Sequence, residues 1–289
     1  MSRLLKRLQR AQRRGQRLNE GPLVVDVTRG QIRLERGSRD AIDAAERVAI
    51  VAQYSATPVQ PLSLSRYLAA LDASGYATAV VSTAEFDEPL EFPHGVPDRT
   101  VVIRRPNLGY DFGSWTTGLG WIPGVRSKPV VLLTNDSMLG PFAPIDELLE
   151  WAAEPPGPDI RCLTSSFQFG RHMQSYFLSF RGGILADPVW RRFFDGIRVQ
   201  STKEDVVMAY ELGLSRLAFS ESYSTDEWVT GPDIGAGYEN PTIRAWQGII
   251  ASGAPFLKRT ILTHPDLTAE AAASAEYLQR LYNIDIHQW

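Results

Sequence analysis

Cysteine is almost absent from this chain, which has a single cysteine, Cys162, in 289 residues. One cysteine cannot form an intramolecular disulfide or complete a cysteine-based zinc site. Histidine is also scarce, because the four histidines stand far apart in the sequence, at positions 94, 172, 264 and 287. This composition is typical of a cytoplasmic protein, and we interpret Cys162 as a small buried hydrophobic residue.

Long hydrophobic runs are missing as well. A membrane-spanning helix needs about 20 consecutive apolar residues, whereas the longest apolar stretches here are residues 48–52, 130–133 and the mixed stretch 248–257. We therefore do not expect an integral membrane protein. No apolar segment of roughly 7–15 residues follows the basic N-terminal residues, so a secretory signal peptide is not expected either.

What the chain has is enough apolar content for a globular core, together with an uneven charge. It contains 44% hydrophobic, 22% charged and 10% aromatic residues, which fits one large domain or two small ones. Residues 1–17 hold seven Arg or Lys and no acid, so the rest of the chain has 23 basic and 33 acidic residues. Residues 1–18 have the spacing of a basic amphipathic helix, which either binds the anionic surface of a membrane or stays solvated. The acidic remainder argues against a nucleic-acid partner.

The hydrophobic pattern predicts strands and helices in alternation from residue 46 onward. Residues 48–52 are a continuous apolar run, typical of a strand buried on both faces, and residues 64–74 have helical spacing before Gly75. Strands are also expected at 78–82, 100–103, 130–134 and 176–180, and helices at 145–153, 189–194, 204–217, 243–252 and 269–281. We predict an α/β fold with a Rossmann-like, mostly parallel sheet flanked by helices, which begins with a right-handed βαβ unit.

The first 45 residues are expected to form an extension of this domain. It would consist of the basic helix and a short hairpin, with strands at 23–27 and 31–34 and a turn at Arg29-Gly30. Residues 46–289 would then form a single domain with two halves, 46–150 and 151–289, which meet near the rigid Pro155-Pro156-Gly157-Pro158 segment.

Two segments at the ends of expected strands have polar residues suited to ligand binding. Residues 107–115 contain Gly109 and Gly113 between a strand and a helix, where the helix N-terminus would bind an anion or the glycines would only make a turn. Asp136 follows the apolar strand 130–134, where its carboxylate would either meet a divalent metal or cap an Asx turn.

Five motifs in this order resemble those of the rhamnan-synthesis protein F family. They are Asn-Leu-Gly-Tyr-Asp-Phe-Gly-Ser-Trp (107–115), Leu-Leu-Thr-Asn-Asp-Ser-Met-Leu-Gly-Pro (132–141), His-Met-Gln-Ser-Tyr-Phe-Leu-Ser-Phe (172–180), Tyr-Glu-Leu-Gly-Leu-Ser (210–215) and Asn-Pro-Thr (240–242) followed by Pro-Phe-Leu-Lys (255–258). The resemblance covers about residues 46–265. It implies a bacterial glycosyltransferase of the GT-A type, with a donor half before an acceptor half, that assembles rhamnose-containing cell-surface polysaccharides.

The resemblance also implies the partners of such an enzyme. The donor would be a nucleotide sugar, dTDP-L-rhamnose, and the acceptor a growing or lipid-linked glycan at the inner face of the cytoplasmic membrane. Transfer from this β-linked donor to an α-linked product would invert the configuration of the sugar. The residues expected to bind the donor are Ala52, Gln53, Tyr54, Asn107, Gly109, Asp111, Asn135, Asp136, Ser137 and Lys258.

The same resemblance raises the question of a metal. Asn135-Asp136-Ser137 stands where related enzymes have an Asp-x-Asp metal motif, but Asn135 replaces the first aspartate. A divalent cation, Mg²⁺ or Mn²⁺, is therefore an open expectation, with Asp136 and His264 as its protein ligands and phosphates and water as the others. A lone histidine such as His264 is also commonly a solvated side chain.

An inverting transfer needs a base beside the acceptor hydroxyl. Asp205 and Glu211 are the candidates, and Asp205 is preferred because it begins a helix near a loop, although both also fit ordinary acids on a helix. The residues expected to contact the acceptor are His172, Gln174, Ser175 and, on a loop, Trp228.

Two other functions fit the same sequence. The replacement at Asn135 also suits a non-catalytic carbohydrate-binding or scaffold subunit of a polysaccharide assembly complex. Acidic residues at strand ends serve phosphoryl transfer as well, so a sugar-phosphate transferase is a third interpretation.

Overall fold

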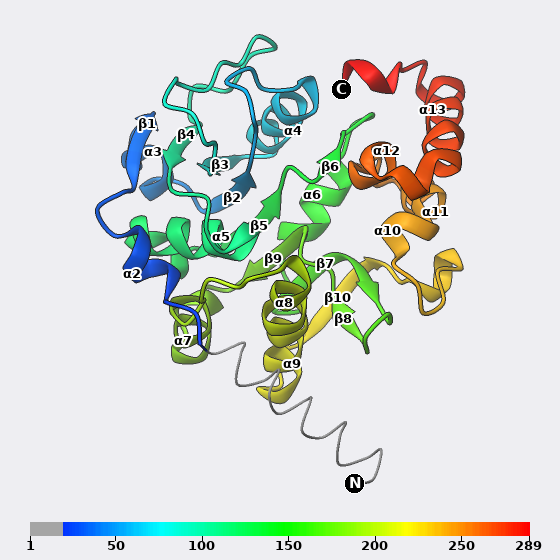
Figure 1. Ribbon diagram of the computed structural model, residues 1–289. Helices are drawn as coiled ribbons and strands as arrows, with labels where there is room; N and C mark the ends of the chain where they lie inside the picture. Colours follow the sequence, from blue (N-terminus) through cyan, green and yellow to red (C-terminus); the bar gives the residue numbers. More distant parts are fainter. Residues whose placement is uncertain (1–19) are drawn as a thin grey trace, which may run out of the picture.

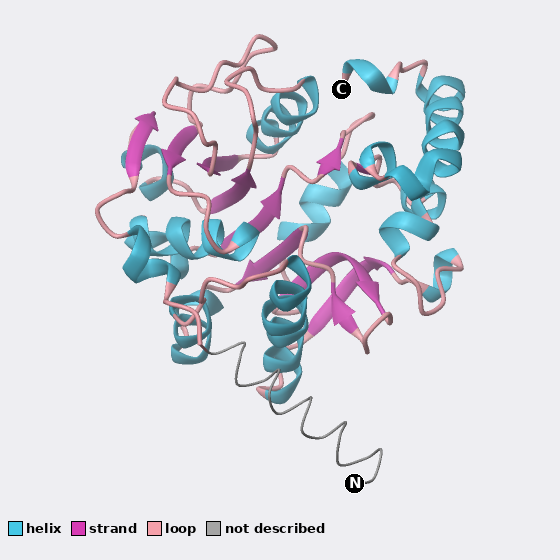
Figure 2. Cartoon of the chain, viewed as in Figure 1, coloured by secondary structure: helices cyan, strands magenta, loops and turns pink. Residues whose placement is uncertain are grey.

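A nine-stranded sheet runs through the centre of the protein, and helices cover both of its faces (Figures 1 and 2). The computed structural model describes residues 20–289. The basic helix and the membrane contact predicted for residues 1–18 lie outside the described residues. None of the helices in the described part of the chain is long and apolar enough to cross a bilayer.

The elements follow one another in the alternating order that the sequence predicts. The strands are β1 (Arg33–Arg36), β2 (Arg47–Gln53), β3 (Tyr76–Ser82), β4 (Val101–Arg104), β5 (Val130–Asn135), β6 (Met138–Leu139), β7 (Ile160–Ser166), β8 (His172–Met173), β9 (Phe177–Arg181), β10 (Thr225–Val229) and β11 (Leu257–Lys258). The main helices are α2 (Val24–Thr28), α3 (Arg39–Asp43), α4 (Leu62–Ala73), α5 (Tyr110–Trp121), α6 (Asp146–Ala153), α7 (Pro188–Asp195), α8 (Lys203–Val206), α9 (Leu212–Ser220), α10 (Pro241–Arg244), α11 (Trp246–Ala251), α12 (Thr260–Thr263) and α13 (Thr268–Tyr282).

The main sheet has the strand order β1-β4-β3-β2-β5-β9-β7-β10, and β8 pairs with β7. Strands β4, β3, β2 and β5 are parallel, which confirms the predicted βαβ unit of β2, α4 and β3. Beyond them β9 runs antiparallel to both β5 and β7, while β10 is parallel to β7. The mixed α/β fold with a large sheet flanked by helices is therefore confirmed, and its second half is the more mixed one.

Strand β2 shows why a continuous apolar run marks the middle of such a sheet. Ile50 packs into the core on the side of α5, whereas Val51 packs into the core on the side of α4. Both side chains are fully buried because successive side chains of a strand point to opposite faces. Helix α4 ends where Gly75 adopts a positive φ of 80°, a backbone conformation that glycine adopts without steric cost.

The C-terminal helices form a third packed region at one side of the sheet (Figure 1). Its core includes Trp246, Ile250 and Leu278, and it meets the rest of the protein through the two-stranded ladder of β6 and β11. In this ladder Lys258 lies opposite Met138, just after the end of β5. The ladder therefore brings a basic residue from late in the chain to the edge of the main sheet.

The hairpin predicted for residues 23–34 is wrong. Residues 24–28 form helix α2, in which the Thr28 hydroxyl donates to the carbonyl of Val24 at 2.8 Å. The fully buried Val24 packs into the core on the side of α5, and the other buried residue of the segment is Thr28, four positions later, which is the spacing of one face of a helix. Strand β1 instead pairs antiparallel with β4 in the main sheet. The domain limits at residues 45 and 150 stay predictions.

Strands β7 and β10 of the main sheet, and the two-residue strands β6, β8 and β11, are not among the strands expected from the sequence. Cys162 lies fully buried within β7, as expected of a small hydrophobic residue. Trp228 lies within β10 and not on a loop.

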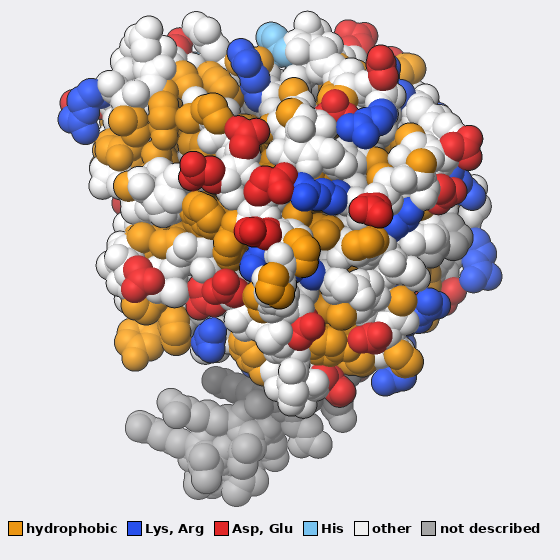
Figure 3. Space-filling model, turned by 180° about the vertical axis from the view of Figure 1, so that it is seen from behind, with side chains coloured by type: hydrophobic (Ala, Val, Ile, Leu, Met, Phe, Trp, Pro, Cys, Tyr) orange, Lys and Arg blue, Asp and Glu red, His pale blue; other side chains and the backbone are white. Residues whose placement is uncertain are grey.

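On the face shown in Figure 3, acidic and basic side chains are interspersed with hydrophobic ones over the part of the surface drawn in colour.

Candidate functional site

A cavity of about 240 Å³ opens beside the carboxyl end of β5. Five parts of the chain meet there: the start of α5, the end of β5, the segment before β9, the helical segment from 203 to 211, and residues 240–260. Ligands of open α/β sheets bind at this end of the strands. The residues that line it are Tyr110, Asp111, Phe112, Asn135, Ser137, Gln174, Ser175, Tyr176, Lys203, Val206, Val207, Glu211, Asn240, Ile243, Lys258 and Thr260.

The cavity brings together seven of the residues predicted for the site, from both halves of the chain. They are Asp111, Asn135, Ser137, Gln174, Ser175, Glu211 and Lys258. Their assembly depends on the crossover of α5, on the antiparallel return of β9 and on the β6–β11 ladder. Each of these three arrangements joins segments that lie far apart in the sequence.

Asn135 connects two of these residues through its amide. Its Nδ2 donates to the carboxylate of Asp111 at 2.8 Å, and its Oδ1 accepts from the backbone and hydroxyl of Ser137 at 3.1 Å and 2.6 Å. An aspartate at position 135 would place a second carboxylate against Asp111, which raises the free energy of both ionised groups. The amide therefore has a structural reason that the Asp-x-Asp comparison did not anticipate.

Asp111 and Asp136 form a coupled acidic pair at this strand end. Burial raises the pKa of Asp111 above its ordinary value. Burial, with the added charge of Asp111, raises the pKa of Asp136 to about 7. The Asp136 carboxylate accepts a hydrogen bond of 3.1 Å from the backbone N–H of Tyr54, so Asp136 points toward the end of β2 and does not line the cavity.

Glu211 is the most strongly hydrogen-bonded acid of the site. It ends a π-helical segment (Val207–Glu211) between α8 and α9, a local widening that is frequent at functional sites. Its carboxylate accepts from the backbone N–H of Ser175 at 2.8 Å and from the Ser175 hydroxyl, and it lies 3.4 Å from Nε2 of His172. Burial alone would raise the pKa of Glu211, but the bonds from His172 and Ser175 hold it below its ordinary value.

His172 completes this arrangement from beneath the cavity. Its side chain is only 3% exposed, and its Nδ1 lies 2.8 Å from the carbonyl oxygen of Gly170. Burial lowers the pKa of His172, but Glu211 and the Gly170 carbonyl raise it by more, so the net shift is upward. His172 therefore orients Glu211 and does not itself line the cavity, and its predicted contact with the acceptor stays a prediction.

Two lysines supply the positive charge. Lys258 lies on β11, with its Nζ 3.3 Å from the Ser137 hydroxyl and 5.5 Å from the centre of the Tyr176 ring. Burial, and then the nearby charge of Lys203, lower the pKa of Lys258. Lys203, the first residue of α8, was not predicted as a site residue, because nothing local distinguishes it from an ordinary exposed lysine at a helix start.

Tyr110 is the second functional candidate that the sequence did not reveal. It lines the cavity with 44% of its surface exposed, and its φ of +53° is a conformation that bulky side chains rarely adopt. The neighbouring Gly109 does not face a ligand, because a Cβ at Gly109 would lie 2.7 Å from Val24. A Cβ at Gly113 would lie 2.4 Å from the carbonyl oxygen of Leu108. Both glycines therefore serve the packing of the chain against itself.

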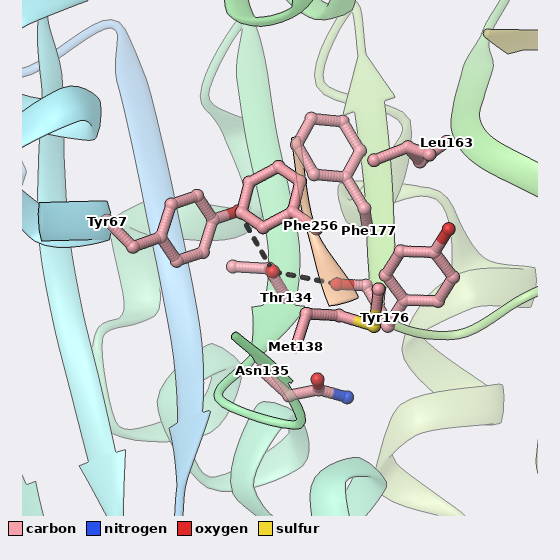
Figure 4. Close-up of a pocket in the computed structure, with 8 residues that line it drawn as sticks. All are labelled: Tyr67, Thr134, Asn135, Met138, Leu163, Tyr176, Phe177 and Phe256. Carbon is pink, nitrogen blue, oxygen red and sulfur yellow. Dashed lines mark hydrogen bonds between the residues drawn. The ribbon is translucent and has the colours of Figure 1, made fainter. Parts of the chain in front are cut away.

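A small, largely apolar space lies behind the end of β5, among side chains that hold this strand end in place (Figure 4). Its volume is about 10 Å³, close to the lower limit for one water molecule. Thr134 donates to the carbonyl of Tyr176 at 2.7 Å and lies 3.0 Å from the hydroxyl of Tyr67. The ring of Phe256 packs edge-on against Tyr67, with 5.5 Å between ring centres. These contacts make the strand end a rigid support for Asn135.

Several predicted donor residues are engaged elsewhere. Ala52 and Gln53 are buried, and the Gln53 amide donates to Gln60 at 2.7 Å. Asn107 donates to the carboxylate of Glu85 at 2.8 Å. Neither these three predicted residues nor Tyr54 line the cavity.

Three of the predicted catalytic, acceptor and metal residues also lie outside the cavity. The Asp205 carboxylate accepts from the Thr202 hydroxyl at 2.8 Å at the start of α8. Trp228 donates its ring N–H to the carbonyl of Ser252 at 2.8 Å and packs, partly buried, against the core on the side of α4. His264 caps the turn after it, accepting at 3.2 Å from the backbone N–H of Asp266.

The described residues do not fit a metal centre held mainly by protein. No group of three or more His, Cys, Asp or Glu side chains within residues 20–289 is placed to hold a metal ion. Asp136 already accepts from Tyr54, and His264 from Asp266. The requirement for Mg²⁺ or Mn²⁺ stays a prediction.

Comparison with known families matches residues 98–286 to rhamnan synthesis protein F. The chain belongs to this family. Among curated sequences it is similar to the virulence protein VirA of Vibrio anguillarum, at 27% identity over 189 residues, covering 56% of this chain and 62% of VirA. It is also similar to protein y4gN of Sinorhizobium fredii, at 24% identity over 148 residues, covering 50% of this chain and 39% of y4gN.

The aligned part of this rhamnan synthesis protein F family member thus spans about three fifths of VirA and two fifths of y4gN. Among solved structures, the glycosyltransferase GlyE of Streptococcus pneumoniae TIGR4 has a TM-score of 0.43 and 12% identity, covering 85% of this chain and 63% of GlyE.

Proposed function

We propose that this protein is a glycosyltransferase that transfers L-rhamnose from dTDP-L-rhamnose to a growing or lipid-linked cell-surface polysaccharide, with inversion. Membership of the rhamnan synthesis protein F family supports the sugar and the pathway class. The parallel strands β4, β3, β2 and β5, followed by the antiparallel β9, support a GT-A-like arrangement.

The observation that carries the proposal is the charge of the cavity. Glycosyl transfer leaves negative charge on the departing diphosphate and positive charge on the sugar ring, so the site must stabilise both. The ammonium groups of Lys203 and Lys258 line the cavity together with the carboxylates of Asp111 and Glu211. The cavity therefore has groups of the right sign for each end of the bond that breaks.

We infer that Asp111 is a better candidate for the base than either residue favoured by the sequence. Asp205 is hydrogen-bonded at the start of α8, and the lowered pKa of Glu211 makes it a weak proton acceptor. Asp111 lines the cavity and has a raised pKa, as a general base near neutral pH requires. Glu211 would instead position Ser175 beside the acceptor, next to Gln174.

The membrane-facing part of the proposal concerns the acceptor. A lipid-linked glycan would be presented at the inner face of the cytoplasmic membrane, where the basic residues 1–18 would add electrostatic attraction to anionic lipid. Binding to vesicles with and without anionic lipid, by the full chain and by a chain without residues 1–18, tests this attachment.

The test of the proposal is donor consumption and product mass. The protein is incubated with dTDP-L-rhamnose and glycan acceptor, and a product heavier by one deoxyhexose supports the proposal, whereas one heavier by a sugar phosphate favours a phosphotransferase. Asp111→Asn is expected to lower turnover at least a hundredfold. Asp26→Asn, at an exposed acid of α2, is the matched control and keeps full activity.

A non-catalytic carbohydrate-binding subunit is the second candidate, because the strongly bonded Glu211 suits binding better than proton transfer. Glycan binding without release of the nucleoside diphosphate from any nucleotide sugar would favour this second function and contradict the first.

A further inference from the structure

Two lysines line the cavity and come from different parts of the chain. Lys203 comes from the start of α8 and Lys258 from β11, and their charges are close enough for Lys203 to lower the pKa of Lys258. Among residues 20–289 neither ammonium group forms an ion pair with a carboxylate within 4.0 Å. Lys203 and Lys258 repel each other, while the carboxylates of Asp111 and Glu211 in the same cavity attract Lys258.

The acids of the same cavity do not neutralise these lysines directly. Asp111 is hydrogen-bonded to Asn135, and Glu211 is hydrogen-bonded to Ser175 and lies beside His172. The hydrogen-bonding capacity of the two carboxylates is thus taken up in part by protein donors, whereas within residues 20–289 the Lys258 ammonium donates to the Ser137 hydroxyl alone, at 3.3 Å. An anion entering the cavity would meet two ammonium groups with donors still available.

The two residues predicted to bind a metal do not line the cavity. Asp136 points away from the cavity toward the backbone of Tyr54, and His264 caps its own turn. One carboxylate oxygen of Asp136 and Nδ1 of His264 are thus engaged by protein donors, while the positive charge of the two lysines lies inside the cavity.

We propose that Lys203 and Lys258 bind the diphosphate of the nucleotide sugar directly and make its binding independent of a divalent cation. This inference rests on the proposed function, because it concerns the same donor. Each ammonium donates to non-bridging phosphate oxygens, and binding the anion relieves the repulsion between the two lysines. Charge-assisted hydrogen bonds of this kind are the strong class of polar contact.

The experiment is calorimetric titration of the full chain with dTDP and with inorganic pyrophosphate, first in EDTA and then in Mg²⁺. We expect both probes to bind in EDTA, with Mg²⁺ changing the Kd of dTDP by less than threefold. Lys258→Met and Lys203→Gln are each expected to weaken both probes by roughly tenfold or more. Lys128→Gln is the matched control, because Lys128 lies outside the cavity and donates to the backbone of Asp43.

The outcomes separate this inference from the proposed function. Binding of dTDP only after Mg²⁺ is added overturns the inference and leaves the glycosyltransferase intact. Binding in EDTA that neither lysine variant weakens, relative to Lys128→Gln, also overturns it. Failure of dTDP, UDP and GDP to bind under either condition overturns both. If Lys258→Met melts early, Lys203→Gln decides, because Lys203 is exposed and its removal leaves the core unchanged.

Discussion

Replacing Glu211 by Gln tests the hydrogen-bonded network beneath the cavity. The change keeps the shape of the side chain but removes its charge and turns one acceptor oxygen into an NH₂ group. That group would face the N–H and O–H of Ser175, which need an acceptor, or Nε2 of His172, which carries a proton when His172 is charged and then needs an acceptor as well. Breaking a buried charged pair costs about 3–5 kcal/mol, a large part of a typical stability of about 5–15 kcal/mol.

The loss of unfolding free energy caused by Glu211→Gln is expected to depend on pH. The pKa of His172 is raised above its ordinary value of 6.5, so its contribution is complete below pH 6.5 and is lost as the pH rises through the folded pKa. The pKa of Glu211 is lowered from 4.5, so its contribution is complete above pH 4.5 and is lost as the pH falls through the folded pKa. The stability difference between wild type and variant is therefore largest between these two values.

The assay is urea unfolding of wild type and Glu211→Gln between pH 4 and pH 9, with Glu276→Gln, an exposed acid of α13, as the control. At pH 5.5 we expect a loss of at least about 3 kcal/mol, unchanged m-value, and a smaller loss at pH 9. A loss under about 1 kcal/mol that does not vary with pH, the size of a surface effect, would refute the proposed pairing of Glu211 with His172.

Three further predictions concern other parts of the site and its supports. Asn135→Asp is expected to destabilise the fold by about 1–3 kcal/mol at pH 7, because the new carboxylate repels that of Asp111. The loss should be smaller at pH 5, where protonation of either acid removes this repulsion, and equal losses at both pH values in urea unfolding would contradict the reasoning. Tyr110→Asn, which tolerates the positive φ, should leave the Tm nearly unchanged yet weaken dTDP about threefold to tenfold by loss of ring stacking, without affecting pyrophosphate, as calorimetry would measure. Arg104→Met should cost about 3–5 kcal/mol and expose residues 84–91 to protease, because Arg104 is bonded to Glu35 at 2.8 Å and to carbonyls of that loop; resistance of the loop to proteolysis would count against it.

The strands that the sequence predicts well are those whose environment is uniform. Strands β2 and β5 are buried on both faces, so nearly every residue is apolar and the pattern is unmistakable. Strand β10 has the pattern Thr-Asp-Glu-Trp-Val and lies at the edge of the sheet, where polar residues are tolerated and the sequence gives little signal. In α2, the alternation of Val and Asp fits a strand as well as a short helix. The sequence does not distinguish the two, because the helix depends on the packing of Val24 into the core.

The site divides in a similar way. Asn135 and Ser137 were predictable because polar residues after a buried strand must lie at its carboxyl end. The direction of the Asp136 side chain was not predictable, because it is set by a hydrogen bond from the backbone N–H of Tyr54, just after the end of the neighbouring strand β2. Lys203 lies near Lys258 only through tertiary contacts, which no spacing in the sequence encodes.

The two-residue ladder between β6 and β11 has a consequence for how this site tolerates change. Side chains alternate along a strand, so a slip of one residue in the pairing of Leu257 and Lys258 with Leu139 and Met138 would carry the ammonium group to the opposite side of the ribbon. Insertions in the exposed loops between residues 140 and 256 leave this pairing intact, whereas a single added residue inside the ladder would move the Lys258 ammonium out of the cavity without substituting any residue that lines it.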